Sequence, residues 1–188
     1  SSYATPFSRS RRFAAAQYRE EHRKWYLGDT ISAGIGQGYT TFTPVQLAHA
    51  TATIANGGVA FRPHLVQRVE DARTGKSRAI AREPAYSLGV KHEHLEVIRN
   101  ALVLVNREGT SATAFRGAAY VSGGKTGTAQ VFSLKGEEYR AHKVDERLRD
   151  HAWFIAYAPA DKPAIALAVL VENGGFGAQA AAPIARTV

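Results

Sequence analysis

The segment whose residues could do chemistry is Val121-Ser-Gly-Gly-Lys-Thr-Gly-Thr-Ala-Gln130, which combines a lysine, glycines and hydroxyls between apolar runs. Lys125 supplies a point charge that can hold a carboxylate or assist a neighbouring proton acceptor. Thr126 and Thr128 supply hydroxyls, and because Gly127 lacks a side chain, an extended peptide can lie against this strand edge. The pattern is compatible with a cleft for a peptide-like ligand, although Lys-Thr-Gly alone favours an exposed turn.

Two helices are predicted before this segment. The first helix begins after Thr43, which is a candidate N-cap, and Pro44 suits its first position. Gly57 and Gly58 end this helix. Its apolar residues lie almost all round, so we expect it to be largely buried. The second helix covers 92–106, where apolar residues recur at spacings of three and four.

Strands are predicted on both sides of the second helix. They cover 62–71, 118–132, 152–158 and 164–172. Pro159 to Pro163 has the length of a turn between two antiparallel strands. The alanine-rich stretch 177–188 begins a further helix. Helices packed on an antiparallel sheet place the chain in the α+β class.

Composition excludes several classes of function. The 188 residues are 45% hydrophobic and 21% charged, which is ordinary for a globular chain. Because there is no cysteine, disulfides, thiol nucleophiles and cysteine-ligated zinc are excluded. No apolar run reaches the roughly 18 residues of a membrane helix, and no secretory signal is present. Since methionine is also absent, we expect a processed or excised piece of a longer protein.

The net charge of +8 fits either a solvated, arginine-rich surface or a surface for an anionic partner. No nucleic-acid-binding motif accompanies the charge, so we expect no nucleic acid partner. His142, Asp145, Glu146, Asp150 and His151 form a polar cluster whose irregular spacing favours a solvated loop over a metal site. Neither a metal nor a cofactor is expected.

The lysine segment belongs to a longer pattern. SGGKTGTAQV follows GIGQGYTTFTPVQLAHATATIANGG and precedes HAWFIAYAP. In order and spacing this resembles the transpeptidase domain of class B penicillin-binding proteins, for which Lys-Thr-Gly is one signature beside Ser-x-x-Lys and Ser-x-Asn. GEEYRAHKVDERLRDHAWFIAYAP is most similar to the penicillin-binding protein 2 branch, which serves cell elongation.

The resemblance covers the chain from about Lys24 onward. It implies an antiparallel sheet flanked by helices, in the fold shared by penicillin-binding proteins and β-lactamases. We expect only the C-terminal portion of one such transpeptidase domain, and therefore an incomplete fold. Within it, 1–30 would be an irregular segment, 31–117 the helical part, and 118–188 the sheet strands with the start of a C-terminal helix.

The implied activity is that of a peptidoglycan D,D-transpeptidase. A serine attacks the D-Ala-D-Ala end of a stem peptide, D-alanine leaves, and an amine of a neighbouring stem completes the cross-link. Lys125 would support proton transfer, Thr126 would bind the substrate carboxylate and Gly127 would permit close approach. The backbone N–H of Thr128 would form part of the oxyanion hole.

Two more residues are predicted to contact the substrate, namely Gln130 and Trp153, which lies near the expected cleft rim. β-Lactams would enter the same site because they mimic D-Ala-D-Ala.

The other half of such a site is absent from the chain. The single Ser-x-x-Lys match, Ser122 to Lys125, overlaps the Lys-Thr-Gly lysine and lies in a strand-like, glycine-rich segment. Residues three apart on a strand point to opposite faces, whereas the family needs them on one face of a helix. No Ser-x-Asn occurs either. We therefore expect this chain alone to be inactive, with the nucleophile elsewhere in its parent.

The family implies peptidoglycan stem peptides and β-lactams as ligands, and a membrane glycosyltransferase as a partner of upstream regions. It also implies the periplasmic face of the bacterial inner membrane, with the anchor outside this chain. Two alternatives remain. One is a β-lactam-sensing receptor of similar fold, and the other is a non-catalytic, basic binding module.

Overall fold

The computed structural model describes residues 26–37, 42–130 and 145–188. The chain divides into two compact units, Ser1–Thr43 and Pro44–Val188. Helix α2 (Leu27–Gly34), which the sequence did not predict, lies in the first unit, and the carboxylate of Asp29 accepts a hydrogen bond from the Tyr26 amide at its start (2.8 Å). In the described ranges, no helix is both long and apolar enough to cross a membrane.

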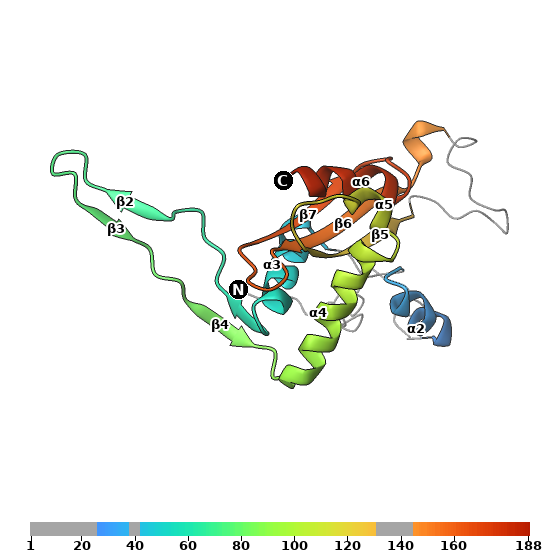
Figure 1. Cartoon of the computed structure of the whole chain (residues 1–188), viewed down its shortest axis with the longest axis horizontal. Coiled ribbons are helices and arrows are strands. Elements are labelled where there is room, and N and C mark those ends of the chain that lie inside the picture. Colours follow the sequence, from blue (N-terminus) through green and yellow to red (C-terminus); the bar gives the residue numbers. More distant parts are fainter. Residues whose placement is uncertain (1–25, 38–41, 131–144) are drawn as a thin grey trace, which may run out of the picture. The chain divides into compact units, whose positions relative to one another are not determined.

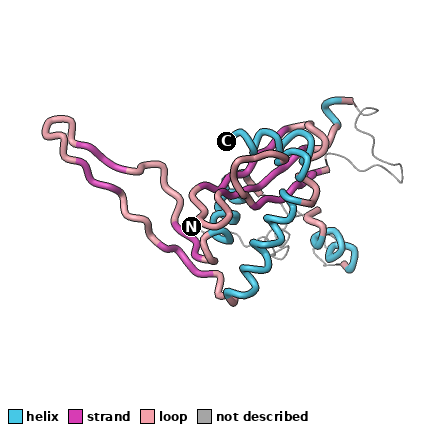
Figure 2. The backbone as a smooth tube through the Cα atoms, in the orientation of Figure 1, coloured by secondary structure: helices cyan, strands magenta, loops and turns pink. Residues whose placement is uncertain are grey.

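The second unit is built on an antiparallel sheet with strand order β5-β6-β7 (Figures 1 and 2). The strands are β5 (Gly123–Ala129), β6 (His151–Ala158) and β7 (Ile165–Val171). Pairing between β6 and β7 is continuous from Ala152 opposite Val171 to Ala158 opposite Ile165. The α+β class and the predicted strands 152–158 and 164–172 are confirmed. Of the predicted strand 118–132, residues 123–129 form β5, residues 118–122 are not strand, and 131–132 lie outside the described residues.

One face of the sheet packs against α5 (Ala112–Phe115) and α6 (Gly177–Thr187). Alternate residues of β6 are buried there, and the ring of Phe154 stacks on that of Phe115 at a centroid distance of 5.7 Å. The facing residues of α6 are alanines at 181, 182 and 185, which let the helix lie close to the sheet. This is the main hydrophobic core of the unit.

The opposite face packs against α3 (Pro44–Ala55) and α4 (His92–Arg107), and the two helices themselves were predicted from the sequence. Tyr157 of β6 is only 1% exposed, and its hydroxyl donates a hydrogen bond to the carbonyl of Arg99 (3.2 Å). Burial raises the pKa of this phenol. The two helices thus make the sheet the middle layer of three.

The prediction that α3 is largely buried is wrong. Its buried residues are Thr51, Thr53 and Ala55, whereas Val45 is 68% exposed. Apolar composition all round a helix does not specify how many sides are covered, and among the described elements the sheet covers one side. The two buried threonine hydroxyls are satisfied inside the helix, each donating to the carbonyl four residues earlier at 2.8 Å.

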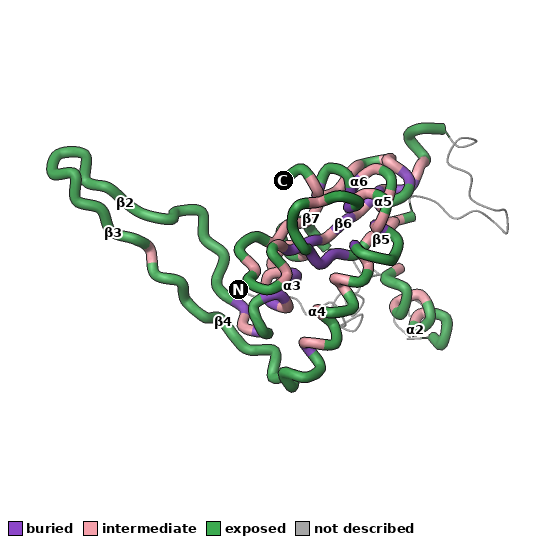
Figure 3. The backbone as a smooth tube through the Cα atoms, in the orientation of Figure 1, coloured by how far each residue is buried: buried purple, intermediate pink, exposed green. Residues whose placement is uncertain are grey.

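Between α3 and α4 runs a two-stranded segment, here called the exposed ribbon, that covers residues 59–87. Strand β1 (Val59–Phe61) pairs with β4 (Pro84–Ser87), and β2 (Arg68–Glu70) pairs with β3 (Ser77–Ala79). Figure 3 shows this segment as exposed almost throughout. The predicted strand 62–71 is therefore wrong over 62–67, because a ribbon open on both faces has no alternating apolar pattern to mark its limits.

Candidate functional site

The predicted site residues lie together on β5 and its neighbour β6. Lys125 pairs with Ile155, Gly127 with Trp153, and Thr128 with Ala152. Lys125 is exposed, while Thr126, Gly127, Thr128 and Trp153 are half-buried, and Gln130 is exposed just beyond the end of β5. The sheet therefore brings all six residues into one region without sealing any of them in the core. Their roles toward a substrate stay predictions.

Lys125 and Thr126 are linked to each other and to a neighbouring loop. The Lys125 ammonium donates to the Thr126 carbonyl at 2.9 Å and lies 3.5 Å from the Thr126 hydroxyl. That hydroxyl is 3.0 Å from the hydroxyl of Thr110, which follows α4. Within the described ranges, no carboxylate neutralises Lys125. The lysine charge is thus available to an anionic ligand, and the Thr126 hydroxyl can donate to one when Thr110 is the donor in their shared hydrogen bond.

The paired glycines before Lys125 make room for aromatic rings. A Cβ on Gly123 would lie 2.4 Å from the Tyr157 ring, and a Cβ on Gly124 would lie 2.6 Å from the Phe154 ring. The two rings occupy opposite faces of the sheet, because successive residues of β6 point to opposite sides. Larger residues at these positions would push β5 away from β6, so the glycines hold the strand carrying Lys125 close to the core.

Gly127 is covered on one side by the start of α6. A Cβ added to Gly177 would lie 2.5 Å from the Gly127 carbonyl oxygen and 2.3 Å from that of Trp153. The first residue of α6 therefore lies directly against the backbones of both strands. A Cβ on Gly127 itself would meet the Cβ of Trp153 at 3.2 Å, which is tight but not forbidden.

A buried hydrogen-bond network connects the end of α4 to the start of β5. The Asn106 amide donates to the hydroxyl of Ser122 at 2.9 Å and to its carbonyl at 3.3 Å. Its oxygen accepts from the hydroxyl of Ser111 at 2.7 Å. All three residues are at most 6% exposed. Neither Asn106 nor Ser111 was predicted. The only signal for Asn106 is a polar residue on a helix face that also carries apolar ones, and Ser111 lies outside the helices.

The same network bears on Ser122 as a nucleophile. The segment after it is a strand, Ser122 is buried, and its hydroxyl is held by Asn106. The predicted strand in place of a helix start is therefore confirmed, and it supports the rejection of Ser122 and Lys125 as a catalytic Ser-x-x-Lys pair, which stays a prediction.

The first residue of β6, His151, is hydrogen-bonded to the turn after β7. Asn173, in the left-handed conformation (φ 55°), donates its backbone N–H to His151 Nδ1 at 2.9 Å. Its side-chain amide donates to the carbonyls of Arg147 and Arg149. His151 thus acts as a hydrogen-bond acceptor, and the residues before β6 are anchored. His142 of the predicted polar cluster lies outside the described residues, and within them no group of three potential ligands could hold a metal.

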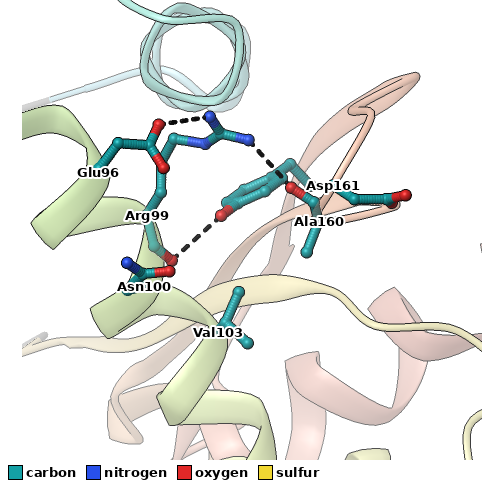
Figure 4. A pocket seen from close by; sticks show the side chains of 7 residues that line it. Glu96, Arg99, Asn100, Val103, Ala160 and Asp161 are labelled. Atoms are coloured by element: carbon teal, nitrogen blue, oxygen red, sulfur yellow. Dashed lines mark hydrogen bonds and ion pairs between the residues drawn. The ribbon is translucent and has the colours of Figure 1, made fainter. Parts of the chain in front are cut away.

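A polar cavity of about 330 Å³ lies between α4 and the β6–β7 turn. Figure 4 shows Arg99 reaching across it, with hydrogen bonds to Glu96 at 2.7 Å and to the Ala160 carbonyl at 3.0 Å. Its guanidinium thus ties α4 to the turn after β6. The residues lining this cavity do not include Lys125 to Gln130, so it is separate from the predicted site.

Comparisons with known proteins agree on one family. The family model described as "Penicillin binding protein transpeptidase domain" matches residues 14–188. The peptidoglycan D,D-transpeptidase MrdA of Haemophilus influenzae is 44% identical over 168 residues, which is 88% of this chain and 26% of that protein.

Solved structures agree. Pseudomonas aeruginosa PBP2 in complex with WCK 5153 has a TM-score of 0.70 and 34% identity, over 89% of this chain and 33% of that one. In a complex between PBP2 and MreC from Helicobacter pylori, the matching chain has a TM-score of 0.68 and 27% identity, over 88% of this chain and 27% of that one. This chain thus spans about a quarter of the length of the curated relatives it matches.

Proposed function

The chain belongs to the family of penicillin-binding protein transpeptidase domains, and from this membership we propose that its parent protein is a peptidoglycan D,D-transpeptidase of the penicillin-binding protein 2 branch. This chain would be the C-terminal portion of the transpeptidase domain. It would supply the Lys-Thr-Gly half of the active site, and a serine outside this chain would supply the nucleophile. The observation that carries the proposal is the exposed Lys125 beside the accessible hydroxyl of Thr126 on β5.

The proposed reaction has two acyl transfers. The serine oxygen attacks the carbonyl carbon between the two D-alanines, the peptide C–N bond breaks, and D-alanine leaves carrying the serine proton. An amine of a second stem peptide then attacks the acyl ester, and the serine recovers a proton. Lys125 would stabilise negative charge and support these proton transfers, while Thr126 would bind the terminal carboxylate of the donor. The N–H of Thr128 would stabilise the oxyanion, a contribution of about 3–4 kcal/mol for one donor.

The remaining roles follow from position. Gly127 would let the donor peptide approach the free edge of β5, with Gln130 and Trp153 at the rim. β-Lactams would acylate the same serine as substrate mimics. The parent would be anchored outside this chain and face the periplasm. A membrane glycosyltransferase of the elongation machinery would be its partner through upstream regions.

Labelling with a fluorescent penicillin tests this proposal. We expect covalent labelling of the full-length parent, prevented by an unlabelled β-lactam, and no labelling of the 188-residue chain alone. Lys125→Ala in the parent should slow acylation by at least about a hundredfold. The matched control is Lys162→Ala, which removes an exposed lysine in the β6–β7 turn and should leave the rate unchanged.

Two results would contradict the proposal. One is a parent that is not acylated, and the other is a label that peptide mapping places on a residue of this chain. Transfer of the acyl group to an acceptor amine, followed with a donor peptide ending in D-Ala-D-Ala, separates a transpeptidase from a receptor that is only acylated.

A further inference from the structure

Thr110 is a residue outside the predicted site whose hydroxyl lies against it. The Thr110 and Thr126 hydroxyl oxygens are 3.0 Å apart, and either can be the donor. Among the described residues, Thr126 is the hydrogen-bond partner of the Thr110 hydroxyl. Thr110 is exposed and Thr126 half-buried, so a ligand can reach the pair. Among the described residues, the Thr110 hydroxyl therefore bonds no part of the fold other than Thr126, and any effect of this hydroxyl is exerted through Thr126.

The loop that carries Thr110 is held firmly on both sides. A Cβ on Gly109 would lie 2.7 Å from the Val105 Cα, so this position must be glycine for the loop to close on α4. Ser111 is 1% exposed and donates to the Asn106 side chain at 2.7 Å. Since Asn106 also bonds Ser122 at the start of β5, one buried residue sets the position of Thr110 relative to the strand that carries Thr126.

The direction of the bond between the two threonines decides whether Thr126 can bind an anion. A hydroxyl has one proton and two acceptor lone pairs. The Lys125 ammonium, 3.5 Å from the Thr126 hydroxyl, can only donate. When Thr110 also donates, both lone pairs of Thr126 are engaged and its proton is free for a carboxylate. A hydroxyl that accepts hydrogen bonds is also a stronger donor.

We infer that Thr110 is a positioning residue for the donor carboxylate, which it serves by donating to Thr126 and thereby directing the Thr126 proton toward the ligand. The inference rests on the proposed function, because it assigns Thr126 to the carboxylate of a D-Ala-D-Ala donor or a β-lactam. In this inference Thr110 acts through its contact with Thr126 and not through a contact of its own with the carboxylate or the reacting atoms. Its effect therefore depends on the ligand having a carboxylate, which a purely structural role would not require.

The test compares acylation of the full-length parent by a penicillin and by the methyl ester of the same penicillin. Thr110→Val keeps the shape of the side chain and removes the hydroxyl, Thr110→Ser retains the hydroxyl, and Thr113→Val is the control. Thr113 is an exposed threonine of the adjacent α5. For Thr110→Val we expect the second-order rate with the free acid to fall about five- to tenfold, the effect of one hydrogen bond. The rate with the ester should change less than about twofold.

Rescue and coupling complete the test. Thr110→Ser should restore the rate with the free acid, Thr113→Val should equal the wild type, and Thr110→Val should add nothing in a Thr126→Val background. A wild-type rate for Thr110→Val, an equal loss with acid and ester, or additive effects of the two valines would overturn the inference. If the wild type reacts and one of these patterns appears, the proposed function stands and only this inference fails. A wild type that does not react removes both.

Discussion

Replacing Gly177 by alanine should loosen the contact between α6 and the strand that carries Lys125. The new Cβ would lie 2.3 Å from the Trp153 carbonyl oxygen and 2.5 Å from that of Gly127, whereas real Cβ atoms stay beyond 3.0 Å. Both neighbours are backbone atoms of a sheet and cannot turn aside, so the start of α6 must move away by about 1 Å.

The size of the effect follows from two opposing terms. Overpacking costs about 1–3 kcal/mol, and exchanging glycine for alanine at a compatible backbone position contributes about 0.4–1 kcal/mol in the other direction. We therefore expect α6 to lose about 1–2 kcal/mol of local stability. That loss corresponds to amide exchange about five- to thirtyfold faster.

Hydrogen exchange measured by mass spectrometry on the full-length parent reports this local loss. Peptides from α6 and from β5 should exchange faster in Gly177→Ala, and acylation by a fluorescent penicillin should slow because the Gly127 backbone shifts. The matched control is Gly34→Ala at the end of α2, where an added Cβ has nothing within 4 Å. Exchange in α2 should then be unchanged or slower.

An exchange rate of α6 in Gly177→Ala within twofold of the wild type would refute the reasoning, because the clash would then have been absorbed without moving the helix. Faster exchange confined to regions other than α6 and β5 would refute it equally.

Three further predictions concern residues that hold the fold. Asn106→Ala should destabilise the domain by about 1–3 kcal/mol in urea unfolding, since the buried hydroxyl and carbonyl of Ser122 lose their partner. Phe154→Ala, at a fully buried position, should cost about 3–5 kcal/mol in the same measurement. The amides of Thr74 and Arg73 donate to Asp71 and lower its pKa below 3.8. The turn is therefore stabilised at pH values above 3.8, and it loses this stabilisation as pH falls through the folded-state pKa of Asp71. Amide shifts of the turn in an NMR titration would follow this loss. The pH dependence should be absent in Asp71→Asn.

The elements that the sequence predicted well are those whose pattern repeats within a single element. Apolar residues that recur every three or four positions were sufficient to predict α4. Gly57 and Gly58, both with positive φ, end α3 as expected. The strands β6 and β7 were found because Pro159 and Pro163 delimit the turn between apolar runs. The position of Lys125 on a strand was predictable because its segment lies between apolar runs.

The features that the sequence left unpredicted depend on contacts between distant residues. Asn106 and Ser122 are 16 positions apart, as are Thr110 and Thr126, and no local pattern marks either pair. No packing role was predicted for the glycines at 123 and 124, whereas the structure shows that two aromatic rings require them. Which glycine lies against which ring depends on the register of β5 against β6, and register is a property of the folded sheet.

The exposed ribbon also provides a site at which the protein can be tagged. Its tip is a tight turn from Asp71 to Lys76 whose backbone bonds close within the turn, and none of the side chains there is buried. Exposed turns of this kind tolerate inserted sequence better than strands or helices do. An epitope or a small fluorophore-binding tag placed after Gly75 should therefore report where the parent resides in living bacteria while β5 keeps its geometry.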